Sequence, residues 1–226
     1  MSFAYLQSTS ISTTAGATNT LTLPSQVSKN SLIVVSIRMG DTTTTISSIA
    51  DNVSTVYSQV GSQIDGGGDV LYAWQGLNTA SSGNNTLTVT NSAASGSSFR
   101  MSAAEYGSDG TQSRDTFRST DANTNTPTAG GTITPAGNNE LIIGLLDEAG
   151  GAGAISATGS FTLRESVDVK EALEDWIQTS ATATDVGFSL TNADNCAAFV
   201  IAYKQTAGGA TTVVRVPQLM TLGVGV

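Results

Sequence analysis

Two short stretches of the sequence decide the fold: Asn30-Ser31-Leu32-Ile33-Val34-Val35 in the first half of the chain and Asn139-Glu140-Leu141-Ile142-Ile143 in the second. Each opens with turn-forming polar residues and continues as an unbroken run of aliphatic side chains, most of them β-branched. A short apolar run without alternation is typical of a strand that is covered on both faces. The two stretches therefore predict two fully buried β-strands, one in each half.

The two stretches belong to a longer internal repeat. In both halves a proline is followed by the buried strand, then by a tryptophan, a Thr-containing strand and a strand that ends in tyrosine. Large side chains at matching places in two halves are expected to anchor a repeated core, and we expect the two tryptophans to hold equivalent positions. The predicted core anchors are Leu32, Trp74, Tyr106, Leu141, Trp176 and Tyr203.

Apolar or alternating runs recur along the whole chain between clusters of turn residues, which is typical of a sandwich or barrel. Within Val70–Gln75, Val70, Tyr72 and Trp74 are expected on one face and Leu71 and Ala73 on the other. The predicted strands are Phe3–Thr9, Thr18–Leu23, Leu32–Arg38, Ile46–Ala50, Thr55–Val60, Val70–Gln75, Asn84–Thr90, Ser98–Tyr106, and, after a polar bridge, Glu140–Asp147, Phe161–Glu165, Val169–Gln178, Ala183–Leu190, Ala197–Tyr203 and Thr211–Val216.

These patterns predict an all-β fold: an antiparallel, jelly-roll-like β-sandwich over residues 1–206, built from two sequence-related halves at about 18–110 and 130–206. Two arrangements of the halves are compatible with the repeat. Two small sandwiches in tandem would place a linker at Ser119–Gly131. One larger sandwich would take strands for both of its sheets from each half, as in jelly rolls. The shortness of the second half favours the single sandwich.

The composition excludes several kinds of chemistry. The chain has no histidine, one cysteine and a net charge of −9. Catalysis by Ser-His-Asp or Cys-His groups and zinc binding through imidazole are therefore excluded. The acidic balance argues against nucleic-acid binding, and no apolar run is long enough for a membrane helix. We expect a non-enzymatic protein without a cofactor, and the N-terminal residues do not read as a signal peptide.

Asp65-Gly66-Gly67-Gly68-Asp69 is the one loop with the composition of a cation site. Two carboxylates and free backbone carbonyls suit Ca²⁺, which makes Asp65 and Asp69 candidate metal ligands. The stretch lacks the alternating ligands and the closing Glu of an EF-hand. A glycine hairpin that is acidic by coincidence fits as well, and we expect no metal site here.

Three further groups of residues have both a functional and a structural interpretation. Asp147-Glu148 and the acidic residues of 171–175 include enough carboxylates for a glycosidase pair, but we expect them to face solvent. The two tryptophans suit either sugar stacking or a core, and their repetition favours a core. Cys196 precedes an apolar run and is expected to be a small buried hydrophobe.

The C-terminal segment, 207–226, is predicted to be an apolar arm that follows a Gly208-Gly209 hinge. It lacks the period of an amphipathic helix, so we expect it to dock on another subunit by adding a strand to a sheet edge. The alternative is that it packs on its own domain. The predicted partner-binding residues are Val213, Val214, Val216, Pro217, Leu219, Met220, Leu222, Val224 and Val226.

Over about Leu21 to Lys204 the chain resembles β-sandwich proteins of phage virions and bacterial surfaces. The resemblance is carried by 30–35, Trp74, Ala104-Glu105-Tyr106-Gly107, Leu173-Glu174-Asp175-Trp176 and 194–199. It implies no catalytic residue. It implies a capsid decoration (cement) protein that forms a homooligomer, expected as a trimer. Such a protein would bind the major capsid protein or another virion subunit, on a virion surface assembled in the host cytoplasm. The alternative is a carbohydrate-binding or adhesion module of a phage tail or cell surface.

Overall fold

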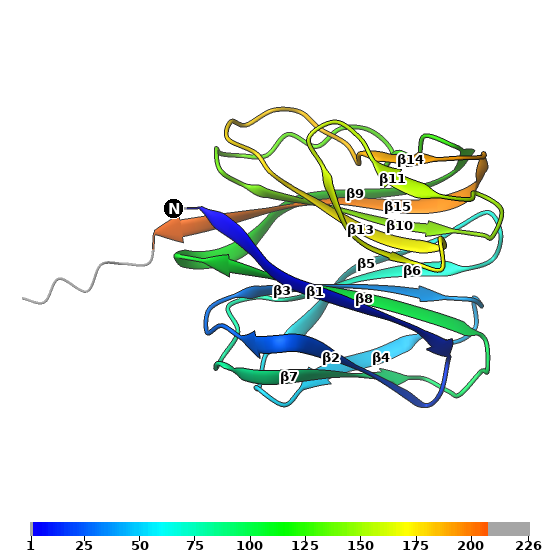
Figure 1. Cartoon of the computed structure of the whole chain (residues 1–226), viewed down its shortest axis with the longest axis horizontal. Coiled ribbons are helices and arrows are strands. Elements are labelled where there is room, and N and C mark those ends of the chain that lie inside the picture. The colour runs from blue at the N-terminus through cyan, green and yellow to red at the C-terminus, as the bar shows by residue number, and fades with distance from the viewer. Residues whose placement is uncertain (1, 208–226) are drawn as a thin grey trace, which may run out of the picture.

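The computed structural model describes residues 2–207, and all the secondary-structure elements in this range are β-strands. All strand pairs are antiparallel, which confirms the predicted all-β sandwich class (Figure 1). Within the described range, no helix exists that is long and apolar enough to cross a membrane.

Ten strands form two five-stranded sheets, which we call the N-inner and C-inner sheets. In spatial order the N-inner sheet consists of β1 (Phe3–Thr14), β8 (Ser98–Ser108), β3 (Leu32–Met39), β6 (Val70–Gly76) and β5 (Tyr57–Ile64). The C-inner sheet consists of β12 (Thr162–Val167), β13 (Glu171–Ile177), β10 (Leu141–Glu148), β15 (Asp194–Ala207) and β9 (Gly110–Thr124).

Smaller sheets form the two outer layers (Figure 1). The N-outer sheet consists of β2 (Thr18–Val27), β7 (Gly83–Asn91) and β4 (Ile46–Asp51). The C-outer ribbon consists of β11 (Ile155–Ala157) and β14 (Phe188–Leu190). The molecule is thus a stack of sheets with the two five-stranded sheets in the middle.

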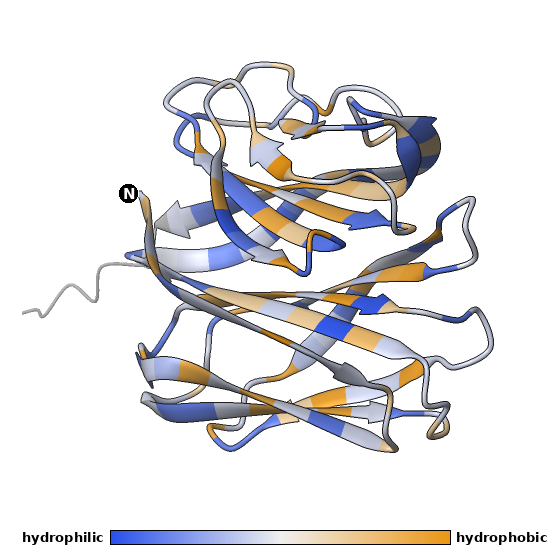
Figure 2. Cartoon of the chain, turned by 45° about the vertical axis from the view of Figure 1, so that its right-hand side comes forward, coloured by the Kyte–Doolittle hydropathy of each residue, from blue (hydrophilic) through white to orange (hydrophobic). Residues whose placement is uncertain are grey.

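Hydrophobic side chains fill every space between the layers. One cluster joins the N-outer and N-inner sheets, a second joins the two inner sheets, and two smaller clusters lie under the outer layer of the C-terminal half. Figure 2 shows hydrophobic residues recurring along the strands of each layer, whereas the loops are mostly pale or blue. Because both faces of each inner sheet are covered, β3 and β10 are buried at every position, as their unbroken apolar runs predict.

Strand β6 shows how one strand serves two cores. Val70, Tyr72 and Trp74 belong to the cluster against the N-outer sheet, whereas Leu71 and Ala73 belong to the cluster between the inner sheets. This confirms the predicted division of the strand into two faces. The alternation of side chains shows which residues share a face of the strand. It does not show that both faces are buried, which here follows from the apolar residues on each face.

The two inner sheets have the same strand order. Read from one edge, the N-inner sheet runs β1-β8-β3-β6-β5 and the C-inner sheet runs β9-β15-β10-β13-β12. The contacts between the sheets are reciprocal, since β1 lies against β12 while β9, the counterpart of β1, lies against β5. The sheets therefore meet as two copies meet in an isologous dimer interface.

Three features differ from expectation. Each sheet takes its strands from one half only, β1–β8 or β9–β15, rather than from both halves. Part of the expected polar bridge forms β9, a 15-residue strand that pairs with β15 from Gly110↔Ala207 to Thr124↔Asp194. A strand is expected at 183–190, but only Phe188–Leu190 forms a strand in the structure. The strand predicted at 211–216 lies outside the described residues.

The physical reason for the missed strand is its composition. β9 is an edge strand made mostly of Thr, Ser, Asp and Arg, and most of its residues are half-buried or exposed. It therefore lacks the hydrophobic pattern on which a sequence-based prediction relies. Its position is decided instead by pairing with β15, which is buried along its middle.

Candidate functional site

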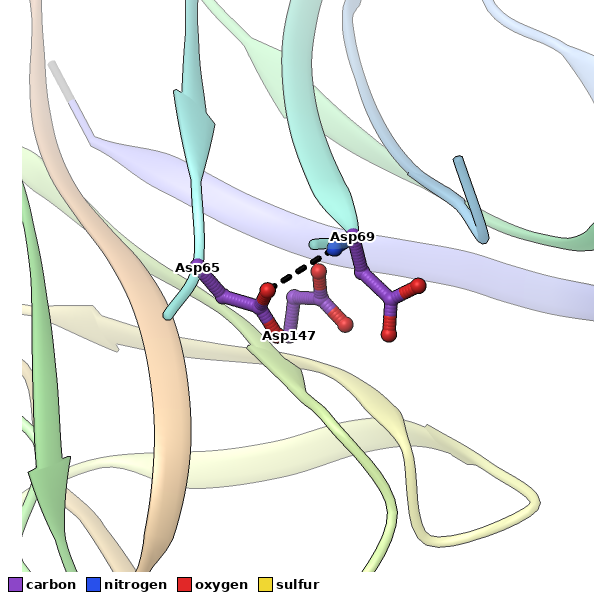
Figure 3. Close-up of side chains that lie close together, drawn as sticks. All are labelled: Asp65, Asp69 and Asp147. Carbon is purple, nitrogen blue, oxygen red and sulfur yellow. Dashed lines mark hydrogen bonds between the residues drawn. The ribbon is translucent and has the colours of Figure 1, made fainter. Parts of the chain in front are cut away.

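Three aspartates from distant parts of the chain meet where the two halves face each other. Asp65 and Asp69 flank the turn between β5 and β6, and Asp147 lies near the end of β10. One carboxylate oxygen from each lies within 4.8 Å of the other two (Figure 3). The predicted metal-ligand candidates Asp65 and Asp69 are thus brought together, and Asp147 joins them. We call these three residues the acidic cluster.

The turn between β5 and β6 fixes the orientation of Asp65. Its Oδ1 accepts hydrogen bonds from the backbone N–H groups of Gly67 (2.9 Å) and Asp69 (2.8 Å). Gly68 has a φ of 95°, a conformation that glycine adopts without strain. With Oδ1 held by the turn, Asp65 directs Oδ2 into the protein, where this atom is buried and accepts no hydrogen bond from the described residues.

Arg38 is the counter-charge of the acidic cluster. Its Nε lies 2.6 Å from Asp147 Oδ1, and its second terminal nitrogen pairs with Asp69 Oδ2. Ser98 Oγ accepts a further bond, of 2.7 Å, from the guanidinium. Arg38 thus binds one oxygen of Asp147, while Asp147 Oδ2 is buried without a hydrogen-bond partner among the described residues.

The environment of the acidic cluster disfavours ionised carboxylates. Burial raises the pKa of Asp147 well above its ordinary value, and the negative charges of Asp65 and Asp69 raise it further against the opposing effect of Arg38. Burial likewise raises the pKa of Asp69, although Arg38 lowers it. Arg38 contacts Asp69 and Asp147, and Lys170 and Arg100 act on Asp69 as further positive charges, so the three carboxylates repel one another when all are ionised.

The other acidic candidates do not face solvent, so that expectation is wrong. Glu148, Glu171, Glu174 and Asp175 are all buried, as is Asp147. Glu148 Oε2 accepts hydrogen bonds from the backbone N–H groups of Gly150 and Ala152, which hold a loop. Hydrogen bonds and ion pairs of this kind make burial of a carboxylate tolerable.

Strand alternation separates the acidic residues of β13. Asp175 binds Arg164 Nε at 2.8 Å, and Glu171 accepts a hydrogen bond from Ser102 Oγ of β8, across the interface between the inner sheets. Glu174 lies on the opposite face, where Oε1 accepts the backbone N–H of Gly187. Burial raises the pKa of Glu171 to about 7 and that of Glu174 to about 8. Glu171 and Glu174 therefore do not form the pair of facing carboxylates that a glycosidase needs.

Each tryptophan lies on the face of its inner sheet that is turned toward the outer layer. The two do not hold equivalent positions, so the prediction that they do is wrong. Trp74 pairs with Val35 in β3, whereas Trp176 pairs with Ile142 in β10, the counterpart of Ile33. Trp74 is buried, but Trp176 is partly exposed. The ring of Phe161 lies edge-on to Trp176, with centroids 5.9 Å apart.

Trp176 lines a surface hollow of about 400 Å³ on the outer side of the C-terminal half. Phe161 also lines it, together with polar residues that include Thr132, Ser160 and Asp185. Asp185 is held in place because its Oδ1 accepts the backbone N–H groups of Ala129 and Val186. The hollow therefore combines an aromatic wall with positioned polar groups.

The remaining predicted residues lie in the core or outside the described residues. Leu32, Tyr106, Leu141 and Tyr203 are fully buried between the two inner sheets. Cys196 is buried as predicted, and burial raises the pKa of its thiol to about 12. The arm residues from Val213 to Val226 lie outside the described residues.

Sequence reasoning missed Arg38, although a signal for it exists. β3 and β10 begin at the repeated residues Leu32 and Leu141, and Arg38 and Asp147 are the seventh residue of their strands. A charged residue within each of two buried strands, at the same repeat position and with opposite signs, indicates that the two pair across the interface.

Comparisons with known proteins identify one weak structural similarity. No family model matches the chain, and no curated protein matches it. Among solved structures, the chain is similar to the STIV MCP, a viral major capsid protein, with 13% sequence identity and a TM-score of 0.26. The alignment covers 91% of this chain and 97% of that one.

Proposed function

We propose that the chain is a non-enzymatic structural protein of a virion, a decoration protein that binds the outer capsid surface and stabilises it. The observation that carries this proposal is the placement of the chain ends. Phe3 at the start of β1 pairs with Ser108, and Ala207 at the end of β15 pairs with Gly110 (Figure 1). Both ends of the described range therefore lie beside the same turn, at one end of the molecule.

The packing of the body supports a mechanical role. A continuous hydrophobic cluster joins the inner sheets, and its members come from both halves in similar number. A close-packed core of this kind resists deformation. A protein that transmits load between capsid subunits needs such a body.

Two surface hollows flank the point where the chain leaves β15. One, of about 530 Å³, is lined by residues that include Lys29, Ser108 and Thr111. The other, of about 290 Å³, is lined by residues that include Asn138 and Lys204. Polar side chains are among the residues that line both hollows, which suits a wet contact with a partner surface at this end of the body.

In this proposal the apolar arm 207–226 binds the major capsid protein or a neighbouring subunit, and the chain forms a homotrimer. Edge-strand pairing and burial of the arm supply affinity at each contact. Repetition of the contact over a symmetric shell raises the overall affinity without new contacts. The protein would be added to the capsid surface after assembly in the host cytoplasm.

The test compares the full chain with a variant that ends at Ala207, which keeps every pair of β15 with β9. Both are added to virions of the encoding virus that have been stripped of the protein, and bound copies are counted by mass spectrometry. We expect the shortened chain to lose most of its occupancy while its melting temperature stays unchanged. Full occupancy by the shortened chain contradicts docking through the arm. Light scattering of the full chain tests the trimer, and a monomer mass of 23.0 kDa contradicts it.

The hollow at Trp176 favours a second candidate function, a carbohydrate-binding or adhesion module. Sugar rings stack their C–H faces on aromatic rings, and the carboxylate of Asp185 and the hydroxyls of Thr132 and Ser160 suit their hydroxyl groups. Trp176→Ala would abolish binding on a glycan array, whereas Thr20→Ala on the exposed face of β2 would not. An array that shows no binding by the unmodified chain contradicts this candidate.

A further inference from the structure

We propose that the acidic cluster binds a calcium ion, which ties the two halves of the chain together. The ligands are Asp65 and Asp69 from the β5–β6 turn and Asp147 from β10. This inference is independent of the proposed function, because it concerns the stability of the body rather than its partner.

The first argument is a pair of buried carboxylate oxygens that lack a partner. Asp65 Oδ2 and Asp147 Oδ2 are both buried and accept no hydrogen bond from the described residues. Asp65 is 4% exposed and Asp147 is fully buried. A buried carboxylate oxygen without a donor is costly, and nearly all such atoms in proteins are bound by a donor or a metal.

The second argument is distance. The three ligand oxygens lie within 4.8 Å of one another (Figure 3). Calcium binds oxygen at about 2.3–2.6 Å, so two of its ligands are separated by about 5 Å at most. Separations of this size are compatible with a single ion bound to one oxygen of each aspartate.

The third argument is charge. When all three carboxylates are ionised, only Arg38 pairs with them directly and Lys170 and Arg100 act on Asp69 in addition, so a divalent cation would reduce the repulsion among the carboxylates. Arg38 binds Asp147 Oδ1 and Asp69 Oδ2, and each of these two residues has a second carboxylate oxygen. The guanidinium thus orients both carboxylates.

The ligand set selects the kind of ion. Its members are carboxylates only, and the chain has no histidine. Oxygen ligands favour calcium or magnesium over zinc and copper. Magnesium requires a nearly regular octahedron, whereas calcium accepts irregular ligand sets such as three carboxylates on a turn and a neighbouring strand.

The test uses the full chain after treatment with EDTA, titrated with CaCl₂ in a calorimeter. We expect one ion bound per chain. At a hundredfold excess of calcium over its dissociation constant we expect the melting temperature to rise by roughly 5 °C or more. NaCl at matched ionic strength would not reproduce the rise.

Two conservative variants locate the site. Asp65→Asn retains an oxygen for the turn, and Asp147→Asn removes a buried charge, so both are expected to fold. Each would lose the calcium-dependent rise in melting temperature, whereas Asp121→Asn, which removes an exposed charge, would keep it. Absence of calcium binding, or a full calcium response in Asp147→Asn, overturns the proposal. So does a melting temperature that changes with pH but not with calcium, since a shared proton would then satisfy the two oxygens.

Discussion

Arg38 Nε lies 2.6 Å from Asp147 Oδ1, and each residue is the seventh of its strand, β3 or β10. The two strands have the same place in their sheets, third of five. The ion pair therefore joins counterpart positions of the two halves, on the central strand of each inner sheet and near the end of that strand. Because Asp147 is fully buried, it depends on Arg38 for compensation of its charge, whereas Arg38, which is 3% exposed, also pairs with Asp69.

The first prediction concerns this ion pair. Arg38→Met leaves Asp147 buried without its counter-charge, so the free energy of unfolding is expected to fall by about 3–5 kcal/mol. Urea denaturation followed by tryptophan fluorescence measures the change. The double variant Arg38→Met/Asp147→Leu removes both charges and is expected to recover most of the loss. A single variant within about 0.5 kcal/mol of the parent would show that the pair is not needed.

The second prediction concerns the pH dependence of stability. The pKa of Glu174 in the folded chain is about 8, above its ordinary 4.5, because the carboxyl is buried. Between these values the folded state holds a proton that the unfolded state releases, so stability falls as the pH rises. One such group contributes a slope of up to about 1.4 kcal/mol per pH unit.

Glu174→Gln isolates this contribution, since the amide oxygen still accepts the Gly187 N–H. We expect the variant to lose less stability than the parent between pH 5 and pH 8, as measured by urea unfolding at several pH values. Parallel curves for the two proteins would mean that Glu174 does not titrate in this way.

The third prediction concerns Gly144 of β10. A Cβ atom at this position would lie 2.6 Å from Glu174 Oε1 and 2.7 Å from its Cγ. Gly144→Ala would therefore displace Glu174 from the Gly187 N–H and is expected to cost about 1–3 kcal/mol of stability. In Gly144→Ala/Glu174→Ala the clash is absent, so the added cost of the alanine at 144 should largely vanish. Thermal denaturation of the four proteins of this cycle measures the coupling.

The fourth prediction concerns the only thiol. Cys196 is 1% exposed, and burial, followed by the charge of Asp194, raises its pKa to about 12. Since the thiolate is the reactive form, we expect no reaction with a thiol reagent at pH 8 in the folded state and rapid reaction in urea. Stoichiometric labelling of the folded chain within minutes would contradict this burial.

The strands and the core were largely predictable because each depends on a local pattern. Unbroken apolar runs identified β3 and β10, and alternation correctly divided β6 into two faces. The polar strand β9 was not predictable in the same way, because its side chains show no hydrophobic pattern and its position depends on backbone pairing with β15. Local patterns also gave no information on which sheet lies against which.

The candidate site was predictable in part. The turn from Asp65 to Asp69 stands out in the sequence, but Asp147 comes from the other half and joins it only through the packing of the inner sheets. Burial of Glu171 and Glu174 went unrecognised for a related reason. A charged residue in an alternating strand reads as solvent-facing unless its partners, here Ser102 and the Gly187 N–H, are known.

The reciprocal stacking of the inner sheets has a consequence for how such an interface is charged. In a dimer of identical chains, the residue at the position of Arg38 or Asp147 would face its own copy. Two arginines or two aspartates would then meet and repel each other. Joining both halves in one chain removes that restriction, because counterpart positions are then encoded separately. Arg38 and Asp147 are an example: they form an attractive pair of opposite charges at a position where strict two-fold symmetry would place two identical residues.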